Sequence, residues 1–227
     1  MNQLLPTLDA ILVAGGSSQR MGFDKLLAPL GEMSVIARGL RAFHDCGDVR
    51  RIVVVCPVGR REDFEPEIKG FPKVVALVEG GAERSDSVAN GLRALDLEER
   101  LSPDFVAVHD AARPLILPES ISLCFQAAMV SGAAALAEKV VDTLHRCDDQ
   151  GIVLEPVPRT NLWRVQTPQI LSWQDLKSLS GSTTDEVSGL LRLEKSAALI
   201  ENPHPNFKMT VPADLVLAAA IIQSRPL

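Results

Sequence analysis

Short apolar runs, each followed by a segment of helical period, constrain this sequence more than any other feature. The runs do not alternate in polarity, which indicates strands that are covered on both faces. They are residues 10–14, 51–56, 73–78 and 105–109. Apolar residues between the runs recur with helical spacing, as in Val35, Ile36, Leu40 and Phe43, and again in Val88, Leu92 and Leu95. Repeated strand–helix–strand units predict an α/β fold with a doubly wound, mostly parallel sheet.

The second half of the chain continues this pattern. Pro118 and Pro212 stand where helices are expected to begin, because proline is favoured in the first helical turn. Thr183 with Glu186 predicts a capping box, and residues 215–222 predict a buried helix. The chain has 227 residues, a length that suits one large domain or two small ones. No linker or repeat divides it, so we expect a single domain over residues 1–227.

One segment departs from the α/β alternation and predicts a protruding β-arm over about residues 138–160. Two extended stretches, residues 138–145 and 152–157, are joined by residues 147–151, whose Asp and Gly residues suit a hairpin turn. An isolated two-stranded hairpin is only marginally stable in water. We therefore expect the arm to pack on another surface, and a second subunit is one candidate.

Charge and cysteine usage exclude several classes of function. The formal net charge of -6 disfavours a broad basic face for nucleic acid. The four cysteines form no CxxC pair, which supports neither a zinc ribbon nor a disulfide scaffold and favours a reducing cytoplasm. The N-terminus lacks the basic region of a signal peptide, and the run at 215–222 is much shorter than a membrane span. We expect a cytoplasmic protein that contacts no membrane.

Three segments of site-like composition each follow a predicted strand. They are AGGSSQRMGFDK at 14–25, GGAERSDSV at 80–88 and VHDAARP at 108–114. Glycine-rich turns at strand ends let backbone N–H groups approach phosphates, and Arg20 and Lys25 can meet phosphate oxygens. The first segment matches neither GxGxxG nor GxxxxGK[ST], which disfavours a dinucleotide fingerprint and a P-loop. Taken singly, each segment also fits a tight turn or a helix cap.

The third segment supplies a candidate metal ligand. Asp110 follows an apolar strand, and a lone carboxylate there could hold Mg²⁺ shared with phosphates. An ion pair between Asp110 and Arg113 is the structural alternative. We interpret His109 as a turn histidine, because no second His or Cys is spaced to join it as a metal ligand. Cations, one carboxylate and no Ser–His–Asp or Cys–His set together predict phosphoryl or nucleotidyl transfer.

These motifs, taken in order, resemble those of a known family. AGGSSQRMG with DK, GGAERSDSV, VHDAARP, VVDTLHR, RTNLW with QTPQ, TTDE and NFKMT are similar to the motifs of the 2-C-methyl-D-erythritol 4-phosphate cytidylyltransferases. The similarity spans about residues 10–218. It implies a Rossmann-like domain of the nucleotide-diphospho-sugar transferase type, whose β-arm interlocks with a partner subunit in a homodimer.

The resemblance also implies roles for individual residues. The residues implied for CTP are Ala14, Gly15, Gly16, Arg20, Lys25, Gly81, Arg84 and Ser87. Those implied for methylerythritol phosphate are Arg113, Thr143, Arg159, Thr167 and Lys208. Asp110 takes the Mg²⁺ position, and Arg20, Lys25, Arg159 and Lys208 are the implied catalytic cations.

Two segments depart from the family pattern, and two other functions stay open. Phe23-Asp24-Lys25-Leu26 stands where many members carry Pro-Lys-Gln, and Pro203-His204-Pro205 replaces a turn that often holds Gly and Asp. The implied reaction is attack of the acceptor phosphate on the α-phosphorus of CTP. One alternative is a cytidylyltransferase for another polyol phosphate, such as ribitol 5-phosphate. The other is a non-catalytic nucleotide-binding regulatory protein.

Overall fold

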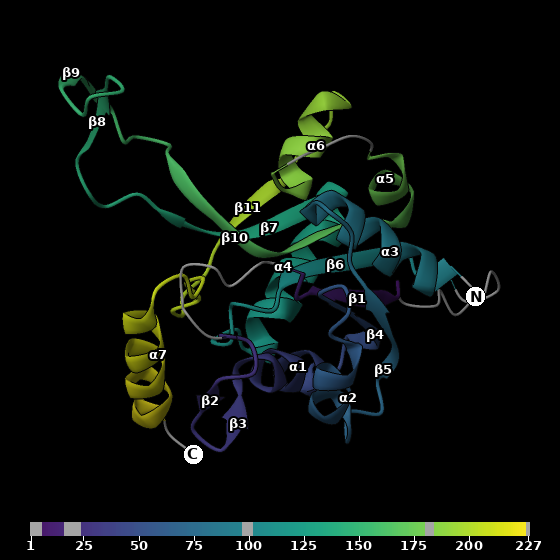
Figure 1. Cartoon of the computed structure of the whole chain (residues 1–227). Coiled ribbons are helices and arrows are strands. Elements are labelled where there is room, and N and C mark those ends of the chain that lie inside the picture. The colour runs from purple at the N-terminus through teal and green to yellow at the C-terminus, as the bar shows by residue number, and fades with distance from the viewer. Residues whose placement is uncertain (1–5, 16–23, 97–101, 180–183, 226–227) are drawn as a thin grey trace.

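A computed structural model describes residues 6–15, 24–96, 102–179 and 184–225, which form one seven-stranded sheet flanked by helices (Figure 1). The strands are β1 (Leu8–Val13), β2 (Pro29–Leu30), β3 (Met33–Ser34), β4 (Val49–Cys56), β5 (Val74–Glu79), β6 (Phe105–Asp110), β7 (Ala133–Lys139), β8 (Leu144–Cys147), β9 (Val153–Val157), β10 (Trp163–Ser172) and β11 (Ala198–Glu201). The helices are α1 (Val35–Asp45), α2 (Arg61–Ile68), α3 (Arg84–Asp96), α4 (Pro118–Ser131), α5 (Trp173–Ser178), α6 (Glu186–Arg192) and α7 (Pro212–Ser224).

The sheet has the order β11-β7-β10-β6-β1-β4-β5. Strand β10 runs antiparallel to both of its neighbours, β6 and β7, and the other strands share one direction. The prediction of a doubly wound, mostly parallel sheet is therefore confirmed. The four apolar runs became β1, β4, β5 and β6, each displaced from its expected bounds by no more than two residues.

Helices cover both faces of the sheet, as the unbroken apolar character of the strands requires. Successive residues of β1 point to opposite faces: Leu12 belongs to a core shared with α1 and α4, and Ile11 to a core shared with α3, α5 and α6. Gly91 of α3 permits a close approach, because a Cβ atom there would lie 2.6 Å from the Ile11 side chain. Among the described residues, none of the helices has both the length and the apolar composition needed to cross a membrane.

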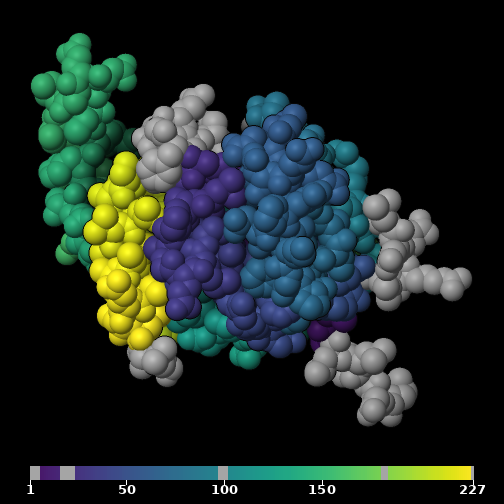
Figure 2. All heavy atoms as spheres, turned by 60° about the horizontal axis from the view of Figure 1, so that its bottom comes forward, coloured from purple at the N-terminus to yellow at the C-terminus, as the bar shows by residue number. Residues whose placement is uncertain are grey.

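The β-arm extends away from the body of the molecule (Figures 1 and 2). Strands β8 and β9 pair only in their own two-stranded sheet, and the Asp148 side chain closes their turn by accepting bonds from the N–H groups of Gln150 and Ile152. Gly151 adopts a φ of 82°, which glycine tolerates without strain. The first arm strand begins later than expected, because Glu138 and Lys139 still belong to β7 and pair with β10.

Two helix predictions need correction. Helix α7 begins at Pro212 as expected, but Ala218 is its only buried residue, and Val216 is 73% exposed. It packs a single stripe, including Leu215 and Ile222, against the edge of the core, so its other apolar side chains stay in solvent. Helix α6 is capped by Asp185, whose side chain accepts a bond from the Ser188 N–H, and Glu186 is used elsewhere. Thr183 of the expected capping box lies outside the described residues.

Candidate active site

A cavity of about 280 Å³ lies at the carboxyl ends of the central strands. It is lined by residues of the three segments that follow β1, β5 and β6, so these segments meet at one edge of the sheet. Its lining residues are Val13, Ala14, Gly15, Lys25, Leu26, Ala82, Glu83, Arg84, Ser87, Asp110, Ala112 and Lys208. A larger open hollow of about 530 Å³, between the β2–β3 hairpin and α2, contains none of the predicted site residues.

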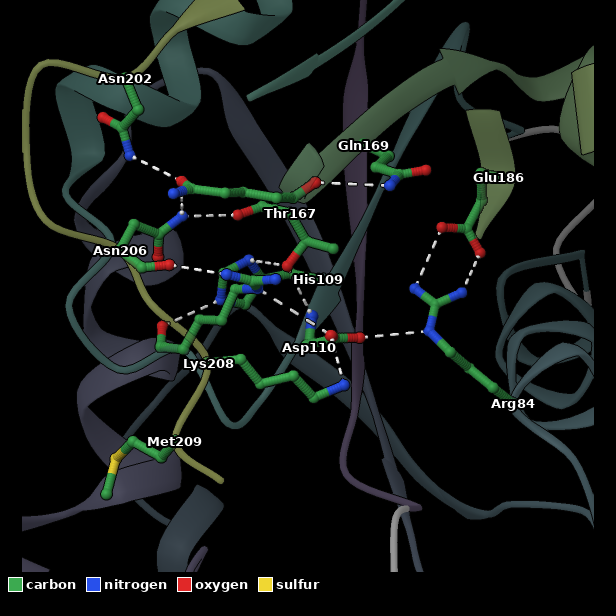
Figure 3. A network of polar contacts seen from close by, with 12 residues as sticks. Arg84, His109, Asp110, Thr167, Gln169, Glu186, Asn202, Asn206, Lys208 and Met209 are labelled. Atoms are coloured by element: carbon green, nitrogen blue, oxygen red, sulfur yellow. Dashed lines mark hydrogen bonds and ion pairs between the residues drawn. The ribbon is translucent and has the colours of Figure 1, made fainter. Parts of the chain in front are cut away.

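Asp110, at the end of β6, is the centre of the cavity's charge network (Figure 3). One carboxylate oxygen lies 2.9 Å from Lys208 Nζ and the other 3.2 Å from Arg84 Nε. Burial alone would raise the pKa of this carboxyl, but Arg84 and Lys208 hold it well below its usual range. Asp110 is therefore a charged, buried carboxylate at ordinary pH. The ion pair of Asp110 with Arg113, which was the structural alternative to a metal role, is present but long, at 4.0 Å.

Arg84 lies between two carboxylates. Its Nη1 and Nη2 donate to the two oxygens of Glu186 at 2.6 and 3.0 Å, and its Nε faces Asp110 (Figure 3). Burial would lower the pKa of the guanidinium, yet Glu186 and Asp110 hold that pKa well above its ordinary value. Burial raises the pKa of Glu186, and Arg84 opposes that rise. A two-bond pair of this kind fixes the plane of the guanidinium.

Thr167 supports Asp110 through its backbone. The Thr167 hydroxyl accepts a bond from the Asp110 N–H at 3.0 Å and lies 3.2 Å from His109 Nδ1. The prediction of His109 as a turn residue is wrong: it is fully buried in β6, against the ring of Phe43, and its Nε2 faces the Arg113 carbonyl. Burial lowers the pKa of His109 to about 4, even though the Asp110 charge acts to raise it.

Arg113 is held at the edge of this network by the segment before Lys208. Its Nη1 donates to the Asn206 carbonyl at 2.8 Å, and the Asn206 amide in turn donates to the Thr167 carbonyl at 2.8 Å and to Gln166 at 3.1 Å. The Nε of Arg113 is buried, lies 4.0 Å from an Asp110 carboxylate oxygen, and has no hydrogen-bond partner among the described residues. A guanidinium with an unused buried donor is well suited to receive an oxyanion.

The glycine-rich segments form the other wall of the cavity. Ala14 and Gly15 line it after β1, and Lys25 Nζ donates to the Met209 carbonyl at 3.0 Å. Ser87 also lines it, and its hydroxyl accepts from the Gly81 N–H at 3.2 Å. Gly81 itself does not line the cavity. A Cβ atom at this position would lie 2.2 Å from Asp86, so the need for glycine there is already explained by packing.

Not all predicted residues come together in this chain. Thr143 and Arg159 lie on the exposed arm and do not line the cavity, and Arg159 donates to the Val141 carbonyl. Gly16 and Arg20 lie outside the described residues. Asp24, in the segment that departs from the family pattern, accepts from the Leu26 N–H at 2.9 Å and pairs with Arg60 at 3.1 Å, which is a local structural role.

Glu186 and Asn206 are members of the site that were not predicted from the sequence. Both lie inside motifs named above, TTDE and NFKMT, but Glu186 was interpreted as part of a helix cap and Asn206 had no expected role. One feature of the sequence could have indicated Glu186. Its neighbour Asp185 can cap α6 alone, so the Glu186 carboxylate is left without a capping function.

A doubly wound α/β fold whose strand ends hold cations around one carboxylate defines the class of nucleotidyl-transferring enzymes. A family model, IspD, 2-C-methyl-D-erythritol 4-phosphate cytidylyltransferase, matches residues 8–224. The chain belongs to this family and is a cytidylyltransferase.

Individual relatives and solved structures agree with the family assignment. The 2-C-methyl-D-erythritol 4-phosphate cytidylyltransferase of Geobacillus kaustophilus is 37% identical, over 96% of this chain and 97% of the relative. That of Pelotomaculum thermopropionicum is 36% identical, over 95% and 94%. The crystal structure of the Thermus thermophilus enzyme of the same name matches with a TM-score of 0.75 at 29% identity, covering 97% of this chain and 100% of that one.

Proposed function

We propose that the protein transfers CMP from CTP to 2-C-methyl-D-erythritol 4-phosphate. The products are 4-diphosphocytidyl-2-C-methyl-D-erythritol and pyrophosphate, and the reaction belongs to the non-mevalonate route to isoprenoids. The observation that carries this proposal is the cavity in which Lys25, Lys208, Arg84 and Asp110 meet, within a chain that matches the family along nearly its whole length.

The nucleotide is assigned to the wall formed after β1 and at the start of α3. We assign CTP to Ala14, Gly15, Gly16, Arg20, Lys25, Gly81, Arg84 and Ser87. The supporting geometry is that Ala14, Gly15, Lys25, Arg84 and Ser87 line one cavity, where backbone N–H groups and cations can meet the base and the phosphates.

The acceptor is assigned to the opposite side of Asp110. Lys208 and Arg113 both face the Asp110 oxygen that Arg84 does not use, and the buried Nε of Arg113 has no hydrogen-bond partner among the described residues. Thr167 contributes by holding the Asp110 backbone in place. We assign Thr143 and Arg159 to the acceptor as well, and they reach a cavity only if the arm crosses to another subunit.

The proposed chemistry needs cations rather than a base. A phosphate monoester has a second pKa near 6, so the acceptor phosphate is largely dianionic at neutral pH and attacks the α-phosphorus without deprotonation. The P–O bond to the β-phosphate breaks and pyrophosphate leaves. Lys25 and Arg20 stabilise the charge that develops on the phosphates, and Lys208 and Arg159 orient the incoming phosphate.

Asp110 fits the proposed role of a Mg²⁺ ligand. The described residues contain no cluster of three or more His, Cys, Asp or Glu that could hold a metal alone. A single charged carboxylate facing the cavity suits Mg²⁺, which takes one or two carboxylates and completes its shell with phosphate oxygens and water. Asp110 lines the cavity, and each of its oxygens contacts one cationic group, so the carboxylate keeps acceptor lone pairs for a further cation. When bound, Mg²⁺ would neutralise charge on the CTP phosphates.

We further propose a homodimer joined through the β-arm. The arm carries Val141, Ile152, Val153 and Leu154 with most of each side chain in solvent. An exposed apolar hairpin of this kind is expected to pack on a second surface.

The chain acts as one domain, because strands from Leu8 to Glu201 share one sheet. All four cysteines are free thiols, which supports a cytoplasmic location.

The decisive experiment is pyrophosphate release by the purified protein with CTP and Mg²⁺. Three reactions are compared, one with methylerythritol 4-phosphate, one with ribitol 5-phosphate and one without an acceptor. Release only with methylerythritol 4-phosphate supports the proposal. Release only with ribitol 5-phosphate would keep the nucleotide site and reassign the acceptor, and CTP binding without release from any reaction would leave a regulatory nucleotide-binding protein.

A further inference from the structure

Glu186 is a buried carboxylate that the reaction described above does not use. It is the first residue of α6, it is 3% exposed, and both of its oxygens are bonded to Arg84. A buried charge is costly unless it is well paired, so the presence of a carboxylate at position 186 needs a specific explanation.

Helix capping does not supply that reason. Asp185 already caps α6 by accepting from the Ser188 N–H at 2.7 Å, and the Val187 N–H is taken by the Gln169 side chain at 2.9 Å. The start of the helix is therefore tied to β10 and capped without any contribution from the Glu186 side chain.

The partner of Glu186 also faces the proposed metal ligand. Arg84 uses two nitrogens for Glu186 and its third, Nε, for Asp110 at 3.2 Å (Figure 3). Its charge is thus divided between two carboxylates. If Glu186 were removed, Asp110 would be the remaining ion-pair partner of Arg84 among the described residues. The guanidinium could then turn and donate to Asp110 through two of its nitrogens.

We infer that Glu186 is a positioning residue that limits Arg84 to a single contact with Asp110, so that Asp110 keeps acceptor positions for a divalent cation and the Arg84 guanidinium stays fixed at the cavity wall. This inference rests on the proposed function. It assigns Glu186 an effect on the affinity for Mg²⁺ and CTP, exerted through Arg84, and no contact with either one.

The test is CTP binding measured by titration calorimetry across a series of Mg²⁺ concentrations. Glu186→Gln keeps the size of the side chain and removes its charge. The Mg²⁺ concentration that gives half-maximal CTP affinity is expected to rise by on the order of 10- to 100-fold, the range seen when partners of metal ligands are removed. At saturating Mg²⁺ and CTP, kcat should change much less than KM for CTP.

A double variant separates this role from a merely structural one. In an Arg84→Gln background, the additional change Glu186→Gln should leave the Mg²⁺ dependence unaltered, because Glu186 acts only through Arg84. Glu65→Gln, in the exposed pair with Arg61 on α2, is the matched control and should behave as wild type. If Glu186→Gln does not fold, Glu186→Asp replaces it, with a smaller shift in the same direction.

The outcomes are distinct. A folded Glu186 variant with a lower melting temperature but the wild-type Mg²⁺ dependence would overturn the inference and leave the proposed function intact. A Mg²⁺ shift that persists in the Arg84→Gln background would also overturn it. If the wild-type protein binds no CTP at any Mg²⁺ concentration, both the inference and the proposed function fail.

Discussion

Lys25 and Lys208 bring positive charge to the same cavity from opposite ends of the chain. Lys25 donates to the Met209 carbonyl, the residue after Lys208, so the two cations are held by one short segment. We expect Lys25→Ala to lower kcat by on the order of 10²–10³, the effect of removing one preorganised charge donor. Steady-state pyrophosphate release measures this. Lys195→Ala, at an exposed lysine just after α6, is the control, and near-normal turnover of Lys25→Ala would remove Lys25 from the mechanism.

His109 gives the protein a pH-dependent stability of its own. Its pKa falls from 6.5 to about 4 on folding because the ring is buried, so between these values the unfolded chain binds a proton that the folded chain excludes. Stability is therefore lost as pH falls through this window. Relative to His109→Gln, the wild type should lose about 2 kcal/mol of unfolding free energy between pH 7 and pH 5. Urea unfolding at the two pH values measures this difference.

The exposed histidine His204 serves as the control for that comparison. Its side chain is 41% exposed, and His204→Gln leaves the buried ring of His109 in place, so this variant should still lose stability between pH 7 and pH 5. Equal pH dependence in the wild type and His109→Gln would show that His109 is not the group responsible.

Among the strands of the central sheet, the four parallel strands β1, β4, β5 and β6 were predictable, and β7, β10 and β11 were not. Apolar runs covered on both faces define β1, β4, β5 and β6 from local composition alone. The direction of β10 depends on the arm, which returns the chain beside β7 without a crossover. Glu186 was missed for a related reason. Its partner Arg84 is 102 residues away, and no local pattern records such a pairing.

The arm is expected to be separable from the nucleotide half of the site. Its two strands form their own sheet, and the Val140 N–H bonds to the Leu162 carbonyl where the arm leaves the body. We expect a variant that joins Val140 to Leu162 by a short Gly-Ser turn to bind CTP by calorimetry. It should lose acceptor-dependent turnover by at least about 10²-fold, because the acceptor phosphate is no longer positioned.

A matched variant gives this experiment its control. Arg146→Ala changes an arm residue whose ion pair with Glu155 is in solvent, and it should keep normal turnover. Full acceptor turnover by the shortened protein would contradict the assignment of Thr143 and Arg159 to the acceptor.

At the level of the whole molecule, the proposed dimer makes a prediction about mixed subunits. Arg159→Ala and Lys25→Ala should each inactivate the site to which the residue contributes. Arg159 lies on the arm, whereas Lys25 lies on the body. If the arm serves the partner's cavity, a mixed dimer contains one site with both residues intact. Random mixing of the two inactive variants after unfolding and refolding should restore about a quarter of the wild-type activity.

The two unmixed variants, refolded separately, set the background for this measurement. Activity no higher than that background, in a sample shown by light scattering to be dimeric, would mean that each arm serves its own subunit. The sequence predicts a hairpin that packs on another surface, because an isolated hairpin is only marginally stable. Which subunit would receive Arg159 is not encoded in any local pattern.

Strand β10 carries the base of the arm and the support of Asp110 on one segment. Trp163 pairs with Lys139 at the arm, and four residues later Thr167 holds the Asp110 backbone. Pairing with both β6 and β7 begins at Gln169, which lies opposite Val108 and Ala135, and Thr167 falls in the irregular stretch between Val165 and Gln169. A change in the arm that shifts Trp163 therefore reaches Thr167 before it reaches the part of β10 that is held on both sides. The geometry of Asp110 is thus inherited with β10. A chimaera joined at residues 140 and 162 keeps β10 whole, and under the proposed function it should change the acceptor preference while CTP binding is retained.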